Sequence, residues 1–251
     1  MSEKLAGKVA LVTGGSRGVG AAIAARLAAD GADVAFSFAA DPDEGKKTLA
    51  AIEAAGRRGL AVKADQADPR QAQALVEEVV EQFGRLDILV NNAGVFVTGT
   101  VDAPDRDQAA FDRQLAINVQ GVVSTVVAAV PILAEGGRIV SIAASGSATT
   151  RVPFPGIADY VATKAAVTAY TKGWARDLAP RGITVNVILP GSIDTDMNPA
   201  DSEQASFVTS LTPLGRYGRP EEIAGAVSFL VGPDAEFITG ASLPVDGGLT
   251  S

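Results

Sequence analysis

The stretch Val9-Ala-Leu-Val-Thr13, followed by Gly14-Gly-Ser-Arg-Gly18-Val-Gly20 and the alanine-rich residues 21–30, decides the fold. A β-branched apolar run leads into a glycine turn and then into a helix. This order lets a pyrophosphate approach backbone amides at a helix N-terminus, where the helix dipole favours an anion. The spacing Gly-x3-Gly-x-Gly differs from the usual Gly-x-Gly-x2-Gly, so the loop taken alone fits a tight turn without ligand equally well.

Apolar strands and helices continue to alternate along the chain. Strands are predicted over 9–13, 33–39, 59–64, 86–91, 138–143, 183–189 and 241–245, and helices over 21–30, 43–55, 69–83, 111–133, 160–178 and 221–230. The strands are nearly continuous apolar runs, which is typical of a parallel sheet covered on both faces. The sequence therefore predicts an α/β fold with a Rossmann-type, doubly wound parallel sheet of seven strands, in a single domain spanning 1–251.

Composition excludes several classes of function. The chain has 21 Lys plus Arg against 29 Asp plus Glu, so its net charge of −8 disfavours nucleic acid and anionic membranes as partners. It has no Cys and no His, which excludes disulfides, thiolate sites and Ser-His-Asp chemistry, and we expect no metal site. The longest nearly apolar run, 122–134, is too short to span a bilayer, and the N-terminal residues lack the apolar stretch that is typical of a signal peptide. We expect a cytoplasmic protein.

Ligands of such sheets bind outside the carboxyl ends of the strands. Small and polar residues gather at the predicted strand ends, in Thr13-Gly14, Asp65, Asn91-Asn-Ala-Gly94, Ser145 or Ser147, and Pro190-Gly191-Ser192. The irregular segment 191–219, with a short helix expected near 202–210, follows a strand end and is predicted to be a lid over this crevice.

Tyr160 and Lys164 are four residues apart in a predicted helix and therefore lie on one face. A nearby cation stabilises a phenolate, so we expect Lys164 to lower the pKa of Tyr160 and to make the phenol a usable proton donor. The pair alone also fits an ordinary amphipathic helix.

Taken together, these motifs resemble the short-chain dehydrogenase/reductase family over essentially the whole chain. The resemblance rests on Thr13–Gly20, Asp65, Asn91-Asn-Ala-Gly94, Asn118, Tyr160-x3-Lys164, Pro190-Gly191 and the ending Val245-Asp-Gly-Gly248. It implies that Tyr160 is the general acid or base, that Lys164 lowers its pKa and binds the nicotinamide ribose, and that Asn118 supports a proton-carrying water chain. A serine would hold the substrate oxygen.

The position of that serine departs from the family pattern. Counting back from Tyr160 by the usual family spacing gives Ser147, whereas counting forward from the strand at Arg138 ends next to Ser145. We therefore predict about two extra residues in the segment 143–151. Ser145 is favoured because strand ends are held more firmly than loops, and Ser147 remains the alternative.

The resemblance also implies a nicotinamide cofactor. NAD-dependent members tend to carry an acidic residue at the end of strand two, where this chain has Phe38 and Ala39, and Arg17 can pair with a 2′-phosphate. We therefore expect NADPH rather than NADH. The expected cofactor-binding residues are Gly14, Ser16, Arg17, Gly18, Val19, Gly20, Phe38, Ala39, Asp65, Gln66, Asn92, Ala93, Gly94, Tyr160, Lys164, Pro190, Gly191, Ile193 and Thr195.

Apolar loop residues predict a small-molecule ketone or its secondary alcohol as substrate. They are Val95, Phe96, Val152, Phe154, Met197, Phe207 and Leu211. The first hypothesis is an NADPH-dependent carbonyl reductase. The alternatives are a 3-oxoacyl carrier-protein reductase, for which Arg151, Arg216 and Arg219 are candidate docking residues, and a non-catalytic nucleotide-binding sensor. The resemblance further implies a homotetramer.

Overall fold

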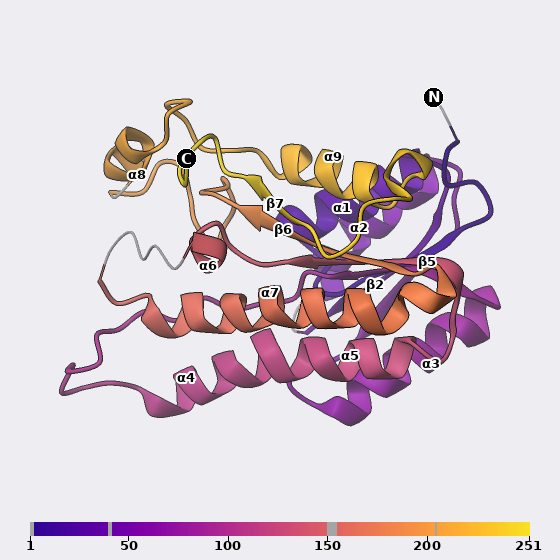
Figure 1. The fold of residues 1–251 in the computed structure, drawn as a ribbon, viewed down its shortest axis with the longest axis horizontal. Coiled ribbons are helices and arrows are strands. Elements are labelled where there is room, and N and C mark those ends of the chain that lie inside the picture. Colours follow the sequence, from indigo (N-terminus) through magenta and orange to yellow (C-terminus); the bar gives the residue numbers. More distant parts are fainter. Residues whose placement is uncertain (1–2, 40–41, 150–154, 204) are drawn as a thin grey trace.

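The structure is a computed structural model that describes residues 3–39, 42–149, 155–203 and 205–251. Within these residues seven strands form one sheet in the order β3-β2-β1-β4-β5-β6-β7, and every neighbouring pair is parallel (Figure 1). The predicted α/β class, parallel sheet and strand number are confirmed. The strands are β1 (Val9–Val12), β2 (Asp33–Phe38), β3 (Gly59–Lys63), β4 (Leu86–Asn91), β5 (Leu133–Ile142), β6 (Thr184–Pro190) and β7 (Ser242–Val245).

The strand order reverses between β1 and β4, which are neighbours in the sheet although two strands separate them in the chain. In a doubly wound sheet this reversal opens a crevice at the carboxyl ends of the two central strands. The glycine loop follows β1 and the Asn91-Asn-Ala-Gly94 segment follows β4, so the topology places both motifs at that crevice.

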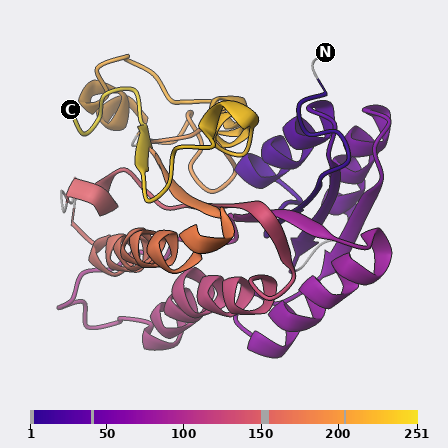
Figure 2. The same ribbon diagram turned by 45° about the vertical axis from the view of Figure 1, so that its right-hand side comes forward.

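Helices cover both faces of the sheet (Figures 1 and 2). One layer contains α1 (Gly18–Ala29), α2 (Pro42–Ala54) and α9 (Pro220–Leu230), and the other contains α3 (Pro69–Phe83), α4 (Gln108–Leu115), α5 (Val122–Ala129) and α7 (Ala158–Leu178). Two short helices, α6 (Gly146–Thr149) and α8 (Ala205–Leu211), lie near the carboxyl ends of the strands. The remaining helical segments are a π-helix at Ala116–Gly121 and 3₁₀ turns at Ala179–Arg181 and Pro233–Ala235.

Alternate residues of the central strands enter two separate apolar cores. Val12 and Phe36 pack in the core under α1 and α9, whereas Leu11 and Ala35 pack in the core under α3, α5 and α7. All four are completely buried, at 0% exposure. Because both faces are covered, the strands read as continuous apolar runs, as the sequence predicted.

The helix predicted over 111–133 is wrong at both ends. The chain instead forms α4 from Gln108, the π-helix and then α5, which ends at Ala129. Leu133 begins β5, where it pairs with Leu86 of β4. Pro131 explains the early end, because proline lacks the backbone N–H that a continuing helix needs and crowds the preceding turn.

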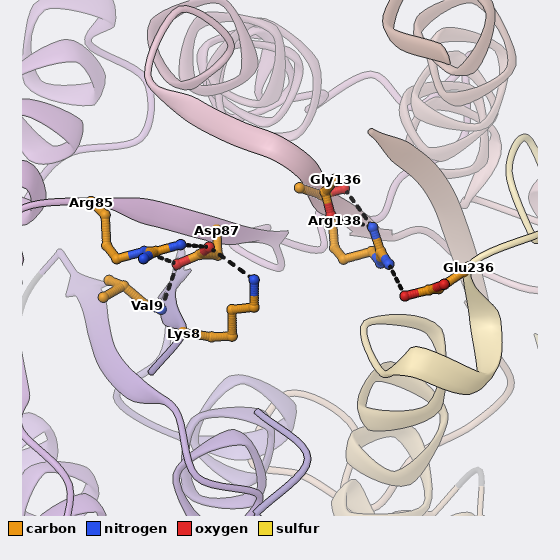
Figure 3. A network of polar contacts seen from close by, with 8 residues as sticks. Lys8, Val9, Arg85, Asp87, Gly136, Arg138 and Glu236 are labelled. Carbon is orange, nitrogen blue, oxygen red and sulfur yellow. Dashed lines mark hydrogen bonds and ion pairs between the residues drawn. The ribbon is translucent and has the colours of Figure 1, made fainter. Parts of the chain in front are cut away.

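A charged network joins β1 and β4 near their amino ends, far from the glycine loop (Figure 3). The carboxylate of Asp87 accepts hydrogen bonds from the Val9 backbone N–H at 3.0 Å and from Arg85 Nε at 2.7 Å, and it lies 3.3 Å from Lys8 Nζ. Nearby, Arg138 donates to the Gly136 carbonyl and its guanidinium lies 3.7 Å from Glu236 (Figure 3). The Asp87 side chain is 3% exposed, so its charge is neutralised inside the protein.

Candidate active site

The glycine loop between β1 and α1 requires small residues because two backbones approach closely there. A Cβ on Gly20 would lie 2.2 Å from the Gly14 carbonyl oxygen, and a Cβ on Gly14 would lie 2.9 Å from Ala93 Cα. Gly14 also has a φ of +64°, in the left-handed region that glycine adopts without strain. The loop therefore lies directly against the segment that follows β4.

Side-chain hydrogen bonds hold the ends of β1 and β4 together. Asn92 Nδ2 donates to the carbonyls of Thr13 at 3.0 Å and Gly14 at 2.9 Å. The Thr13 hydroxyl in turn accepts from the backbone N–H groups of Asn92 and Ala93. Ser37 of β2 completes the frame, because its hydroxyl accepts from the Gly14 N–H at 3.1 Å. The sequence named Asn92 as a ligand-binding residue, and its side chain fixes the loop.

These strand ends border a cleft of about 480 Å³. Almost all of the residues predicted for the site line it, and they come from the glycine loop, the ends of β2, β3, β4, β5 and β6, and α7. The lining includes Gly14, Ser16, Arg17, Gly18, Val19, Gly20, Phe38, Ala39, Asp65, Gln66, Asn92, Ala93, Gly94, Ser145, Tyr160, Lys164, Pro190, Gly191, Ile193 and Thr195. Asn118 and Ser147 do not line the cleft.

Tyr160 and Lys164 point into the cleft from α7. Lys164 is 5% exposed, and its Nζ donates to the Ile142 carbonyl at 3.0 Å and lies 5.8 Å from the centre of the Tyr160 ring. Burial raises the pKa of Tyr160 to about 12 and lowers the pKa of Lys164 to about 8. The expected lowering of the Tyr160 pKa is therefore wrong for this structure, in which loss of hydration on burial raises it.

The aromatic ring of Phe96 packs edge-on against Tyr160, with ring centres 4.8 Å apart. Phe96 belongs to the segment 92–107 that joins β4 to α4, and it lines the cleft as predicted. It therefore restricts the Tyr160 ring by direct contact.

Asn118 lies in the π-helix and is completely buried. Its Oδ1 accepts from the Val95 N–H at 2.9 Å, and its Nδ2 donates to the Val95 carbonyl at 2.9 Å and to the Thr163 hydroxyl at 3.1 Å. Both ends of the amide are thus occupied by protein groups. The side chain fastens the 92–107 segment to α7, and the expected water chain stays a prediction. A π-helix at this place fits the frequent occurrence of such segments at functional sites.

The structure distinguishes the two candidate serines. Ser145 lines the cleft directly after β5, its backbone N–H donates to the Pro190 carbonyl at 2.8 Å, and its hydroxyl bonds no residue that the structure describes. The Ser147 hydroxyl instead donates to the Ala144 carbonyl at 2.6 Å and lies 3.2 Å from the Thr168 hydroxyl. The extra residues form α6 after Ser145. The geometry therefore favours Ser145, as counting from the strand did.

The end of the cleft next to β2 and β3 carries charged residues. Asp65 pairs with Arg113 of α4, whose Nη2 lies 2.9 and 3.0 Å from its two carboxylate oxygens. Arg17 lies at the start of α1, and its Nη1 is 3.9 Å from an oxygen of Asp196. Gln66 is buried, and its Nε2 donates to the Thr125 hydroxyl at 2.8 Å.

The segment 191–219 borders the other side of the cleft. A Cβ on Gly191 would lie 2.7 Å from Asp246 Cα, so this segment begins in contact with the C-terminal tail. Met197 and Leu211 line the cleft as expected, whereas Phe207 does not and its neighbour Val208 does, because α8 turns Phe207 outward to 52% exposure. Val152, Phe154 and Arg151, which were also predicted, lie outside the described residues.

The comparisons with known proteins agree with this geometry. The family model described as Enoyl-(Acyl carrier protein) reductase matches residues 14–250. A 3-oxoacyl-[acyl-carrier-protein] reductase from Staphylococcus aureus (strain Mu50 / ATCC 700699) is 39% identical over 246 residues, covering 96% of this chain and 98% of that protein. The cyclic-di-GMP-binding biofilm dispersal mediator protein of Escherichia coli (strain K12) is 43% identical over 241 residues, covering 96% of each.

A solved structure is more similar still. The crystal structure of a short chain dehydrogenase from Burkholderia cenocepacia J2315 in complex with NADP has a TM-score of 0.95 and 50% identity, covering 99% of this chain and 100% of that chain. The chain belongs to the short-chain dehydrogenase/reductase family. It is an oxidoreductase of this family.

Several residues of this short-chain dehydrogenase/reductase site escaped the sequence analysis. Arg113, Ser37 and Leu249 line the cleft, and none of the three is itself a residue of a family motif. Of these three, only Arg113 could have been found from the sequence, because it is a cation in the predicted helix, before Asn118. Among the described residues no group of three or more His, Cys, Asp or Glu side chains forms a candidate metal site. No helix in the described ranges is long and apolar enough to cross a membrane.

Proposed function

We propose that this short-chain dehydrogenase/reductase is an NADPH-dependent reductase that reversibly converts an apolar ketone into a secondary alcohol. The observation that carries the proposal is the meeting of Tyr160, Lys164 and Ser145 in the same cleft as the glycine loop. A proton donor, a cation and a hydroxyl thus face a space that borders a helix N-terminus. This is the arrangement that carbonyl reduction with a nicotinamide cofactor requires.

The residues present fit a dinucleotide. Gly14, Gly18 and Gly20 line the cleft without side chains, and the N-terminus of α1 at Gly18 favours a pyrophosphate. We propose that the adenosine lies beside Phe38 and Asp65, the pyrophosphate beside the glycine loop and Thr195, and the nicotinamide ribose beside Lys164. Each of these residues lines the cleft.

The protonation states suit reduction. A Tyr160 whose pKa is about 12 keeps its proton at neutral pH, so the hydroxyl is ready to donate it to a carbonyl oxygen. The chemistry that NADPH supplies when bound is a hydride to the carbonyl carbon. The Ser145 hydroxyl would donate a hydrogen bond to the same oxygen and orient it, as donors of an oxyanion site do. Charged Lys164 would stabilise the phenolate that Tyr160 leaves behind.

Preference for NADPH over NADH is supported by charge. Neither Phe38 nor Ala39 offers a carboxylate to ribose hydroxyls, and Arg17 at the cleft carries the positive charge that a 2′-phosphate attracts. The NADP in the similar Burkholderia cenocepacia structure is consistent with this choice.

An apolar substrate is supported by the side chains around Tyr160. They are Val95, Phe96, Ile157, Met197, Val208, Leu211 and Leu249. For the alternative, a 3-oxoacyl carrier-protein reductase, the described docking candidates are weak, because Arg216 lies 2.6 Å from Glu222 and is thereby neutralised. A thioester arm in the assay nevertheless separates the two functions, as described below.

We further propose a homotetramer in the cytoplasm. The exposed apolar side chains of Val127 on α5 and Tyr170 on α7 support one interface, and Phe229 and Phe237 near α9 support a second. Light scattering that gives the mass of a monomer would contradict the tetramer.

The assay that tests the function is oxidation of NADPH and of NADH with a panel of apolar ketones and one 3-oxoacyl thioester. We expect turnover of ketones with NADPH and a much lower kcat/KM with NADH. Equal efficiency with both cofactors would contradict the NADPH preference. Thioester turnover far above ketone turnover would favour the carrier-protein alternative, and tight NADPH binding without any turnover would favour the sensor.

A further inference from the structure

The segment 92–107, between β4 and α4, contacts the start of α7 at Asp159 and Tyr160 and the residues just before the helix. Gly99 N–H donates to the Gly156 carbonyl at 2.8 Å, and the Phe96 ring meets the Tyr160 ring edge-on. Both α4 and α7 begin at the same end of the molecule (Figure 1). The placement of the Tyr160 hydroxyl therefore depends on how firmly this segment is attached to α7.

Arg106 makes the charged part of this attachment. Its Nη2 donates to Asp159 Oδ1 at 3.0 Å, and its guanidinium lies over the Phe111 ring at 3.5 Å from the ring centre. The Arg106 side chain is only 18% exposed, and its Nη1 is buried without a partner among the described residues. An unpaired buried N–H opposes folding, so this arginine is a poor choice for stability alone.

Asp159 is the residue directly before Tyr160, in the first turn of α7. A carboxylate is favoured there by the helix dipole, and Arg106 fixes its direction from a different element. Arg106 does not line the cleft, so it touches neither substrate nor cofactor. A shift of about 1 Å in a reacting group is enough to slow a reaction about a hundredfold, so small changes in this turn matter.

We propose that Arg106, through its ion pair with Asp159, is a positioning residue that holds the first turn of α7 and thereby places the Tyr160 hydroxyl for proton transfer. The inference rests on the proposed function for its kinetic consequence. The positional part stands independently, because it concerns the conformation of the protein without any ligand.

The test compares Arg106→Met, which keeps the apolar stem and removes the charge, with Arg106→Lys, which keeps the charge. Arg58→Met is the matched control, because Arg58 also pairs with an aspartate, Asp33 at 2.7 Å, and stacks on a phenylalanine, Phe83 at 4.8 Å, but these partners belong to β2 and α3 and not to α7. We expect Arg106→Met to lower kcat by about tenfold or more with little change in KM for NADPH. Arg106→Lys should recover part of that loss, and Arg58→Met should keep the wild-type kcat.

A second readout does not depend on activity. The chain has three tyrosines, so 3-fluorotyrosine labelling gives three fluorine signals, and Tyr160→Phe identifies the one from Tyr160. We expect Arg106→Met to move or broaden the Tyr160 signal and to leave the other two in place, whereas Arg58→Met moves none of them.

The outcomes separate the two proposals. An unmoved Tyr160 signal in folded Arg106→Met, or a kcat within about twofold of wild type, would overturn the positioning role. An equal loss of kcat in Arg58→Met would also overturn it, because the effect would then be one of general stability. Wild-type protein that reduces no ketone would contradict the proposed function, and the fluorine spectra would still decide the role of Arg106.

Discussion

At the scale of single residues, the protonation states of Tyr160 and Lys164 determine what the cleft can do chemically. Tyr160 keeps its proton far above neutral pH because burial raises its pKa to about 12, whereas burial brings the pKa of Lys164 down to about 8. Tyr160 therefore keeps its proton across the physiological pH range, whereas Lys164 begins to lose its charge near the upper end of that range. Loss of hydration on burial determines the direction of both shifts.

The pH dependence of cofactor affinity follows from Lys164. As the pH rises through about 8, Lys164 loses its charge, so we expect the affinity for NADP⁺ to fall several-fold between about pH 7 and 9.5. Fluorescence or calorimetric titration measures it. The chain has no His and no Cys to titrate in this window, and the α-amino group is common to every variant. Lys164→Met should bind more weakly at pH 7 and show a flat profile, and an equally steep profile in this variant would contradict the assignment.

Ser145→Ala and Ser147→Ala should have opposite effects on activity and on stability. Ser145→Ala should lower kcat on the order of a hundredfold, because the substrate oxygen loses its hydrogen-bond donor, while the free energy of unfolding stays nearly unchanged. Ser147→Ala should keep most of the activity but lose about 1 kcal/mol of stability, since it removes the bonds to Ala144 and Thr168. Steady-state kinetics and urea denaturation of both variants measure this. The reverse pattern would identify Ser147 as the catalytic serine.

At the scale of the elements, side chains connect the ends of neighbouring strands. At the carboxyl ends, Asn92 and Thr13 connect β1 to β4 and shape the cleft. At the amino ends, Asp87 connects the same two strands through Val9, Arg85 and Lys8 (Figure 3). The first set serves the site and the second serves the fold, so substitutions in the two sets should have separable effects.

Asp87→Asn tests this separation. Burial alone would raise the pKa of Asp87, but hydrogen bonds from Arg85 and Val9 and the charges of Lys8 and Arg85 hold it below the usual value. The charge therefore stabilises the fold at neutral pH. Loss of the charge should lower the free energy of unfolding by about 2 kcal/mol at pH 7, measured by urea denaturation, with kcat and KM preserved.

The difference should also depend on pH in one direction. Because the folded-state pKa of Asp87 is lowered, the stabilisation is present above the unfolded value of 3.8 and is lost as the pH falls below it, so wild type and Asp87→Asn should converge in acid. The control is Asp112→Asn, an exposed position on α4 whose side chain, among the described residues, bonds only Gln108, and it should change stability by less than about 0.5 kcal/mol. A gap that stays constant below pH 4 would contradict the account of Asp87.

The sequence predicted an element well where the residues that determine its structure lie within one segment. The glycine loop, the apolar strands and the Tyr160–Lys164 face each depend on neighbouring residues, and the structure has them as expected. The end of α5 was predicted too late, because the apolar residues around Pro131 continue the helical pattern into β5. The choice between Ser145 and Ser147 needed α6, a short helix that the sequence did not indicate.

Features that depend on contacts between distant segments could not be predicted from the sequence. Asp65 and Arg113 form an ion pair at one end of the cleft although 48 residues separate them. The raised pKa of Tyr160 likewise follows from packing that no short motif contains, and the sequence predicted the opposite direction. Family resemblance supplied the residue types of the site, but not the hydration of the cleft that sets their protonation.

The whole molecule brings Tyr160 and the glycine loop to one cleft. Tyr160 comes from the helical layer of α5 and α7, whereas the glycine loop leads into α1 in the layer on the other face of the sheet (Figure 1). The sheet edge between them fixes their separation, and the segment 191–219 closes the remaining side. The central claim is that this arrangement binds NADPH through the glycine loop and protonates a ketone through Tyr160.

Tyr160→Phe tests that claim most directly. The Tyr160 hydroxyl bonds no residue that the structure describes, so its removal should leave the fold and the cleft intact. We predict that the variant binds NADPH with a Kd within about twofold of wild type and reduces ketones at least about a hundredfold more slowly. Retention of the wild-type rate, or loss of NADPH binding together with activity, would contradict the account.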